Sequence, residues 1–194
     1  MARPREFSID EALEKAMHVF WDKGYESASL RDLTAAMGIS KSSLYDTFGS
    51  KHELFLAAID RYNATVSSCS LDAIITQNPS PRAGIQQAFE TMLDKIETEG
   101  ETRGCFVSNC AVEVATHDGA AANRVSEGLS HIEDSFYRAI ERGRALGEIH
   151  TTLDSRAVAR HLTSTVNGLM VMAKANPDRR TLQDVVDVAL SVLG

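Results

Sequence analysis

Three serines near the start of the chain are each followed, three positions later, by an acidic residue, and two glycines fall between them. A serine hydroxyl at a helix N-cap accepts a hydrogen bond from a backbone amide, and the acid favours the positive end of the helix dipole. Glycine readily adopts the left-handed conformation that commonly ends a helix. The pairs are Ser8 with Glu11, Ser29 with Asp32 and Ser50 with Glu53, and the glycines are Gly24 and Gly38.

These signals predict helices over residues 9–23, 30–37 and 41–48, and a fourth helix that begins after Ser50. Apolar residues recur at helical spacing within each of them. Because helices this short are not stable alone, their apolar faces must pack on one another and form a compact unit.

The remainder of the chain also has helical patterning. The Asn-Pro-Ser-Pro sequence at residues 78–81 is a break, and its second proline suits the first turn of the next helix. No segment alternates apolar and polar residues as a strand does, so the predicted fold class is all-α. The helices expected after the break cover about residues 82–98, 105–115, 119–146, 155–174 and 181–193.

Composition excludes several classes of protein. Hydrophobic residues make up 43% of the 194 residues, which is too apolar for a disordered chain, and no apolar run is long enough to span a membrane. The N-terminus does not resemble a signal peptide, and three cysteines without a metal-type spacing favour a reducing cytoplasm. The six histidines have no metal-ligand spacing, so we expect neither a metal nor another cofactor.

The net charge of −7 argues at first against a nucleic-acid partner, because binding to phosphates requires lysine and arginine. The charge is unevenly distributed, however. Residues 1–52 hold seven basic and eight acidic residues, whereas residues 53–194 hold thirteen and nineteen. Composition alone therefore does not predict DNA binding, and a motif must support that prediction.

Residues 29–48 have the pattern of a helix, a three-residue turn and a second helix. Gly38 allows the turn, and Ser40 caps the second helix. Short or basic side chains that can approach base edges follow at Lys41, Ser42 and Ser43. The alternative to a DNA-reading motif is an ordinary helical hairpin with no role in binding. The apolar residues that would fix the two helices are Leu30, Leu33, Met37, Ile39, Leu44 and Phe48.

This region resembles the DNA-binding domain of the TetR family over about residues 9–59. The family's Tyr-x-x-Phe-x-x-Lys-x-x-Leu pattern is present as Tyr45, Phe48, Lys51 and Leu54, and the family's phenylalanine of the first helix is matched by Phe20. The resemblance implies a helix-turn-helix DNA-binding domain over residues 1–50. It also implies a larger helical ligand-binding and dimerisation domain over residues 51–194.

The resemblance further implies a DNA-binding transcriptional regulator, most simply a repressor that acts as a homodimer on an inverted-repeat operator and is released by a small-molecule inducer. Asp46, an acid on the reading helix, either accepts from a cytosine amino group or points to solvent, and we expect solvent. The phosphate contacts implied are Ser29, Arg31, Tyr45 and Lys51, and the residues nearest the bases are Lys41, Ser42, Ser43 and Thr47, with Ser40 at the helix N-terminus.

The last two expected helices each have an apolar face, and two such helices from each subunit would make a four-helix bundle. The alternative is that these faces are buried within their own subunit. The predicted interface residues are Val158, Leu162, Val166, Leu169, Met172, Leu182, Val185, Val186, Ala189 and Leu193.

Cys105 and Cys110 flank an apolar segment that resembles a branch of the family containing electrophile and oxidant sensors, although small buried thiols explain the pattern as well. An enzyme is the competing class, as a helical hydrolase with one of these cysteines as nucleophile and His117 as base. Nothing in the sequence identifies its orienting group or oxyanion hole. A helical adaptor that binds only protein is a third class.

Overall fold

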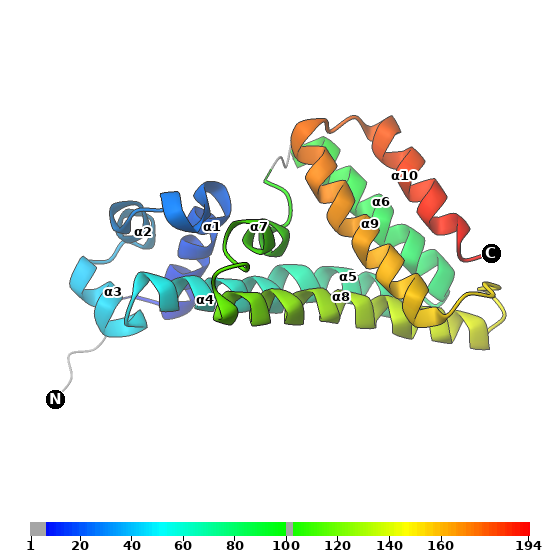
Figure 1. Ribbon diagram of the computed structural model, residues 1–194, viewed down its shortest axis with the longest axis horizontal. Helices are drawn as coiled ribbons and strands as arrows, with labels where there is room; N and C mark the ends of the chain where they lie inside the picture. The colour runs from blue at the N-terminus through cyan, green and yellow to red at the C-terminus, as the bar shows by residue number, and fades with distance from the viewer. Residues whose placement is uncertain (1–6, 100–102) are drawn as a thin grey trace. The chain divides into compact units, whose positions relative to one another are not determined.

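A computed structural model describes residues 7–99 and 103–194 (Figure 1), and every regular element in these ranges is a helix. None of the helices found there is long and apolar enough to cross a membrane. The chain divides into two compact units. One comprises Met1–Ala64 with Phe106–Ser126, and the other comprises Thr65–Cys105 with Glu127–Gly194. The functional division at residue 50 stays a prediction, because this grouping reflects packing and not activity.

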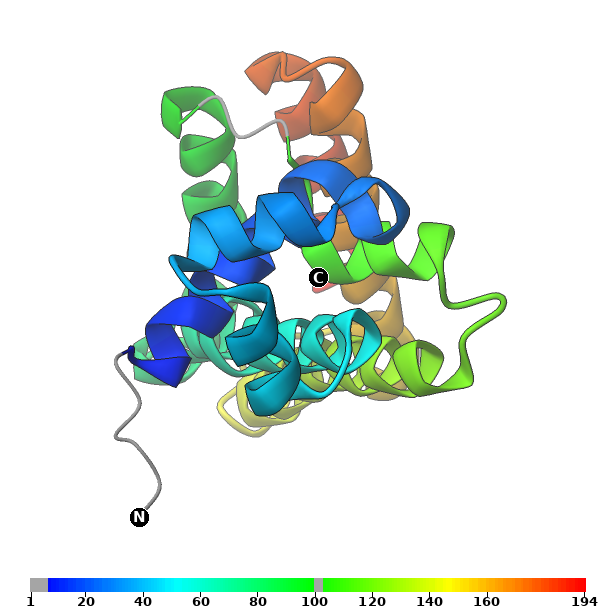
Figure 2. The ribbon, with the colours of Figure 1, turned by 90° about the vertical axis from the view of Figure 1, so that its left-hand side faces the viewer.

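The N-terminal unit begins with the helices that the serine caps predict. In each case the serine Oγ accepts a hydrogen bond from the amide of the acid three residues later, at 3.0–3.3 Å. A later helix of the chain, α7, packs beside α1 and α4 (Figure 2). The helices of the unit are α1 (Ile9–Ser27), α2 (Leu30–Met37), α3 (Lys41–Phe48), α4 (Lys51–Tyr62) and α7 (Phe106–Glu113), followed by the start of α8.

Aromatic side chains form the centre of this unit. The ring of Trp21 meets that of Tyr62 edge-on at 5.0 Å between centroids, and Phe20 meets Phe55 at 5.2 Å. Phe106 of α7 adds a third contact, 5.6 Å from Tyr62. These edge-to-face pairs each contribute about 0.5–1.5 kcal/mol beyond the area they bury. The N-terminal helices therefore share their core with α7.

Gly24 interrupts the helical geometry of α1. Its φ of 78° and ψ of 172° lie in a region that is essentially restricted to glycine. The regular helix thus ends where the sequence predicts, at residue 23, and one further turn follows before Ala28. Gly38 is the left-handed cap of α2, with φ 69° and ψ 30°.

The helix that begins at Lys51 continues past Tyr62 without a break. A π-helical segment, Asn63–Ser67, joins α4 to α5 (Ser68–Gln77). No helix was predicted here, because serines, which favour caps and turns over helix interiors, stand at positions 67, 68 and 70. Single π-turns inside α-helices widen the helix locally and are uncommon elsewhere.

The C-terminal unit contains α5 and four longer helices around one apolar core. Within it, Phe89 stacks on Phe136 with centroids 5.9 Å apart. The observed bounds agree with the predicted ones to within two residues. The last helix starts two residues earlier than expected because Asp178 caps it. The four helices are α6 (Pro81–Glu99), α8 (Gly119–Ala145), α9 (Ser155–Ala175) and α10 (Arg179–Ser191).

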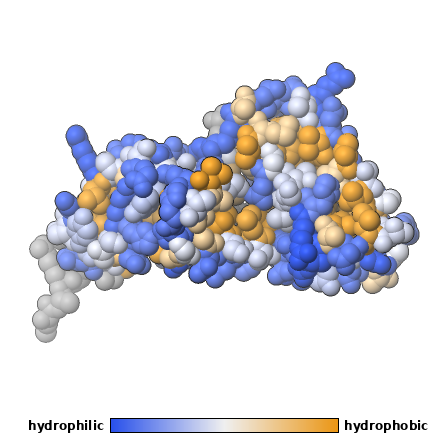
Figure 3. All heavy atoms as spheres, viewed as in Figure 1, coloured by the Kyte–Doolittle hydropathy of each residue, from blue (hydrophilic) through white to orange (hydrophobic). Residues whose placement is uncertain are grey.

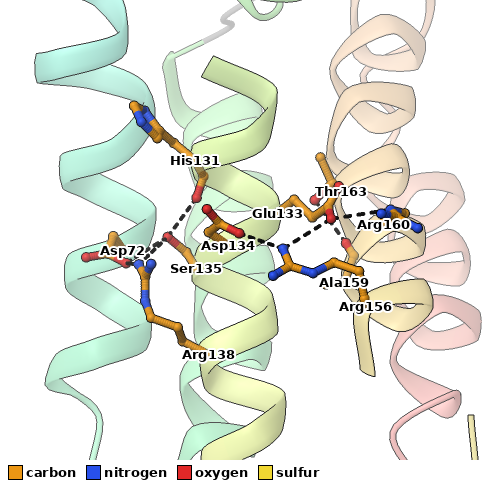
Figure 4. A network of polar contacts seen from close by, with 10 residues as sticks. All are labelled: Asp72, His131, Glu133, Asp134, Ser135, Arg138, Arg156, Ala159, Arg160 and Thr163. Atoms are coloured by element: carbon orange, nitrogen blue, oxygen red, sulfur yellow. Dashed lines mark hydrogen bonds and ion pairs between the residues drawn. The ribbon is translucent and has the colours of Figure 1, made fainter. Parts of the chain in front are cut away.

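A polar network on one face of α8 links it to α5 and α9 (Figure 4). Asp72 accepts hydrogen bonds from Ser135 and Arg138, both at 2.7 Å. On the other side, Arg156 donates to Asp134 at 2.5 Å, and its guanidinium lies 3.9 Å from the ring centroid of Tyr137. The network fixes the register of α8 against its two neighbours.

Candidate DNA-binding surface

The turn between α2 and α3 places these two helices at a fixed angle. Gly38 donates its amide to the Thr34 carbonyl, and Ile39 donates to the same oxygen at 3.2 Å. Leu33, Met37 and Leu44 are buried between the helices. The remaining residues of the predicted small core, Leu30, Ile39 and Phe48, are half-buried. The geometry is that of a helix-turn-helix, with α3 as the second helix.

The N-terminal end of α3 is covered by hydroxyl groups. Ser40 Oγ accepts from the Ser43 amide at 3.1 Å and lies 2.8 Å from Ser42 Oγ and 2.9 Å from Ser43 Oγ. Lys41 and Ser42 are exposed, and Ser43 and Thr47 are half-buried. A helix N-terminus with small hydroxyl groups and a lysine is suited to approach an anionic, hydrogen-bonding partner.

Tyr45 and Asp46 follow on the same helix. The Tyr45 side chain is 40% exposed although it is large and aromatic, and the Lys41 ammonium lies 5.9 Å from its ring centroid. Asp46 is exposed, which is compatible both with a side chain that points to solvent and with one that accepts from a cytosine amino group.

Ser29 and Asp32 form a reciprocal capping box at the start of α2. Asp32 accepts from the Ser29 amide at 3.1 Å and from its hydroxyl at 2.7 Å, and it pairs with Lys23 at 2.8 Å. The hydrogen bond from Lys23, followed by those from Ser29, lowers the pKa of Asp32 to about 2. The Ser29 hydroxyl is thus already bonded within the helix cap, while Arg31, in the first turn of α2, is exposed.

Lys51, at the start of α4, is held against the turn that follows Gly24. Its ammonium lies 4.6 Å from the ring centroid of Tyr25 and donates to the Glu26 carbonyl at 3.5 Å. Tyr25 in turn packs on Phe55 at 4.7 Å. Burial, and then the charges of Glu26 and Asp118, raise the pKa of Tyr25, so its ring remains neutral. Cation–π contact with a tyrosine orients the lysine.

The residues predicted for the dimer interface occupy two different environments. Most are buried in the core of the C-terminal unit of a single chain, whereas Met172 is exposed and Val185 is partly buried. Hydrophobic side chains also gather on the outward face of α9 and α10 (Figure 3). Those buried are Val158, Leu162, Val166, Leu169, Leu182, Val186, Ala189 and Leu193.

A shallow groove of about 390 Å³ lies between α9 and α10 and is lined mostly by apolar atoms, including those of polar side chains. Val188, at the groove, is 70% exposed, and Val171 on α9 is 56% exposed. Sequence periodicity pointed to the inner faces of these helices and missed the two valines, because neither belongs to those faces. The lining residues are His161, Thr165, Asp184, Val185, Val188 and Ala189.

Both candidate sensor thiols are buried. Cys105 is 9% exposed and Cys110 2% exposed, and neither is in a disulfide. His117, the base of the alternative hydrolase, has its ring nitrogens at 2.8 Å from the Thr116 hydroxyl and at 3.2 Å from the Glu113 carbonyl.

Sequence reasoning missed two acidic residues that contact α1 and α4, the helices before and after the helix-turn-helix. Glu113 of α7 accepts from the amides of Tyr25 and Glu26, and Asp118 lies 2.6 Å from His52 Nε2. The residues of each contact are far apart in the chain, so no local pattern relates them.

The fold and this surface together define a helix-turn-helix DNA-binding protein. Comparisons with known proteins support that class and identify the family. The family described as "Bacterial regulatory proteins, tetR family" matches residues 12–58, and the "Tetracyclin repressor-like, C-terminal domain" matches residues 81–189.

Two relatives and one solved structure resemble the chain over nearly its whole length. The HTH-type transcriptional regulator YezE of Bacillus subtilis is 34% identical and aligns over all of both chains. The HTH-type transcriptional repressor ComR of Escherichia coli is 27% identical over 97% of this chain and 90% of its own. A cysteine mutant of the TetR family regulator CifR, solved with 26-base-pair operator DNA, superposes with a TM-score of 0.86 at 33% identity, covering 99% of this chain and 100% of that one.

The chain belongs to the TetR family of helix-turn-helix transcriptional regulators. It is a DNA-binding regulator of transcription and not an enzyme, which excludes the alternative hydrolase. The class of a helical adaptor that binds only protein is excluded on the same ground.

Proposed function

We propose that the protein is a ligand-released repressor that acts as a homodimer on an inverted-repeat operator. The observation on which this rests is the exposed N-terminal end of α3, where a lysine and three serines follow a fixed helix-turn-helix turn. The name of its relative ComR, a transcriptional repressor, supports repression over activation.

Two groups of residues would divide the contacts with DNA. Lys41, Ser42, Ser43 and Thr47 of α3 would be nearest the bases, with Ser40 at the helix end. Phosphates would be contacted by the residues around this helix, namely Ser29, Arg31, Tyr45 and Lys51. Because the Ser29 hydroxyl is bonded to Asp32, its contact would come at the expense of that cap.

A homodimer would supply the second reading helix that an inverted repeat requires. The apolar groove between α9 and α10 and the exposed Val171, Met172 and Val188 support these helices as the interface. In this arrangement the buried residues of the predicted set stabilise each subunit, and the exposed residues contact the partner.

Ligand release is proposed from family membership, in which a response to ligand is typical. A ligand can release DNA only if it binds one arrangement of the protein better than the other, with a coupling on the order of 1–3 kcal/mol. By reciprocity, operator DNA must weaken ligand binding by the same factor. Titrations of a ligand with and without operator measure this directly, and equal affinities would refute release.

Cys105 and Cys110 remain candidates for the sensor of an electrophile or oxidant. Their burial favours a packing role, since a reactive thiolate requires exposure. The test is release of operator by N-ethylmaleimide. If the thiols only pack, N-ethylmaleimide should not release the operator through either of them. Release by the parent that is lost in Cys105→Ser or in Cys110→Ser would identify that thiol as the sensor.

The decisive experiment for the proposed function is a gel shift with fragments of the source genome, followed by a reporter driven by the retained fragment. We expect a retained fragment with an inverted repeat and lower reporter output in the presence of the protein. Higher output would mean activation, and no retained fragment would refute the proposal.

A further inference from the structure

Glu113, the last residue of α7, acts as a remote cap for the turn that follows Gly24. Its carboxylate accepts hydrogen bonds from the backbone amides of Tyr25 at 3.1 Å and Glu26 at 3.0 Å. Amides at the start of a helical turn have no partner within the helix, and a carboxylate there also favours the positive end of the helix dipole. The acceptor comes from 88 residues further along the chain but from the same compact unit.

Gly24 and Glu113 fit each other closely. A β-carbon placed on Gly24 would lie 2.7 Å from Glu113 Oε2 and 2.8 Å from Oε1, which is closer than non-bonded atoms allow. The φ of 78° excludes most other residues independently. The backbone at Gly24 is therefore shaped to let the carboxylate reach the two amides beyond it.

The capped turn contacts Lys51 through both of its residues. The Tyr25 ring faces the Lys51 ammonium at 4.6 Å, and the Glu26 carbonyl accepts from the same ammonium at 3.5 Å. Displacement of this turn would change both contacts together. The position of the lysine thus depends on the backbone that Glu113 fixes.

A second contact from the same region fixes the neighbouring residue of α4. His52 Nε2 lies 2.6 Å from Asp118, which also accepts from the amides of Ala120 and Ala121 at the start of α8. The Ala121 amide, and then His52, lower the pKa of Asp118 and so keep it ionised. Glu113 thus fixes the turn of α1 that contacts Lys51, and Asp118 contacts His52, the next residue of α4.

We propose that Glu113 is a positioning residue for DNA binding, which acts through the Tyr25–Glu26 turn to hold Lys51 where it meets a phosphate. This inference rests on the proposed role of Lys51 in the proposed function. It adds α7, a helix outside the helix-turn-helix, to the parts of the molecule that set operator affinity.

The test is a double-mutant cycle on operator DNA at several salt concentrations, with Glu113→Ala, Lys51→Ala and the double variant. Glu113→Ala should weaken binding roughly three- to tenfold, because Lys51 is still present but no longer held in place, and should reduce the salt slope toward that of Lys51→Ala. In the Lys51→Ala background the same change should have less than about a twofold effect, because the two residues are coupled.

Two further variants separate positioning from general stability. Glu113→Gln keeps the shape but can accept only one of the two amide hydrogen bonds, so an intermediate loss is expected. Glu148→Ala is the matched control. Its carboxylate accepts from Ser80 at 2.7 Å and lies 3.5 Å from the Arg82 amide in the C-terminal unit, and its loss should leave operator affinity unchanged.

Hydrogen exchange in the free protein checks the contact itself, and the Tyr25 and Glu26 amides should exchange faster in Glu113→Ala than in the parent. Binding of operator by the parent tests the proposed function separately, since it involves no Glu113 variant. An unchanged salt slope in Glu113→Ala, or an equal loss of affinity with and without Lys51, would overturn the inference.

Discussion

The lysine at the start of α4 is oriented in the absence of DNA. Contact with the Tyr25 ring and the Glu26 carbonyl limits the positions that the Lys51 ammonium can take. A side chain ordered in advance loses less conformational entropy when it binds a phosphate. Lys41 is exposed on the reading helix, with its ammonium 5.9 Å from the Tyr45 ring, and we assign it to the bases.

Replacement of these two lysines should have different consequences. Lys51→Ala should weaken binding to all sequences and lower the salt slope by about one unit, as the loss of one phosphate contact does. Lys41→Ala should instead change the preferred sequence, because contacts to base edges supply specificity. Fluorescence anisotropy across a salt series and an operator library measures both.

Lys15→Ala is the matched control for this comparison, because Lys15 is exposed on α1 and lies outside the predicted set. It should reproduce the affinity and the sequence preference of the parent. A change of preferred sequence in Lys51→Ala, with an unchanged salt slope, would contradict the division of roles.

Asp32 makes part of the stability of the N-terminal unit dependent on pH. Its pKa is lowered to about 2 from 3.8, chiefly by the hydrogen bond from Lys23. A lowered pKa contributes stability that is fully present above the unfolded value, near pH 4, and is lost as the pH falls toward 2. Asp32→Asn should remove this contribution, so its urea midpoint should fall less than that of the parent between pH 4 and 2.

Lys23→Ala provides the second comparison, because it removes the largest cause of the shift and keeps the carboxylate. It should move the loss of stability to higher pH, toward 4. Identical acid dependence in the parent and in both variants would show that Asp32 has no such role.

At the scale of the elements, the caps were the most predictable part of the molecule. Ser29 and Gly38 determine the two ends of α2 through interactions within a few residues, which a local pattern records. Glu113 was not predictable, because an acid at the end of a helix has the pattern of a solvent-facing residue. Apolar periodicity likewise identified the face of α9 that includes Leu162. It could not show whether that face packs within its own chain, as it does, or against a partner.

The left-handed cap of α2 gives a direct test of what a single glycine contributes. Gly38→Ala would meet no atom within 4 Å, so its cost is conformational alone, about 1 kcal/mol of unfolding free energy. Gly119→Ala is the matched control, since Gly119 also has open space and its φ is not positive. It should be neutral or stabilising by up to about 1 kcal/mol.

Urea unfolding of both alanine variants measures the difference. Equal stabilities would mean that the geometry of the α2–α3 turn does not depend on the left-handed conformation of Gly38.

At the scale of the whole molecule, exposed apolar side chains on α9 and α10 support association. Val188→Asp would place a charge in the apolar groove and should convert a dimer to a monomer with little effect on folding, because Val188 is 70% exposed. Sedimentation velocity at micromolar concentration measures the mass, and circular dichroism checks the fold.

Val112→Asp is the control for this substitution, since Val112 is 82% exposed on α7 in the other unit. It should remain a dimer. The same charge at Leu169 or Val186 would be uninformative, because both are fully buried in the core. A Val188→Asp protein with the mass of the parent would refute this surface as the interface.

The packing of α7 against α1 and α4 limits how this regulator can be recombined with others. A chimera that joins residues 1–50 to a foreign C-terminal part would separate Tyr25 from Glu113. It would also remove Tyr62 and Phe106 from the aromatic core around Trp21. A transplant that keeps its operator preference must therefore carry residues 106–126 with the first 64, or a donor with equivalent side chains there. Exchange of DNA specificity between such proteins is a problem of matching two separate stretches of sequence.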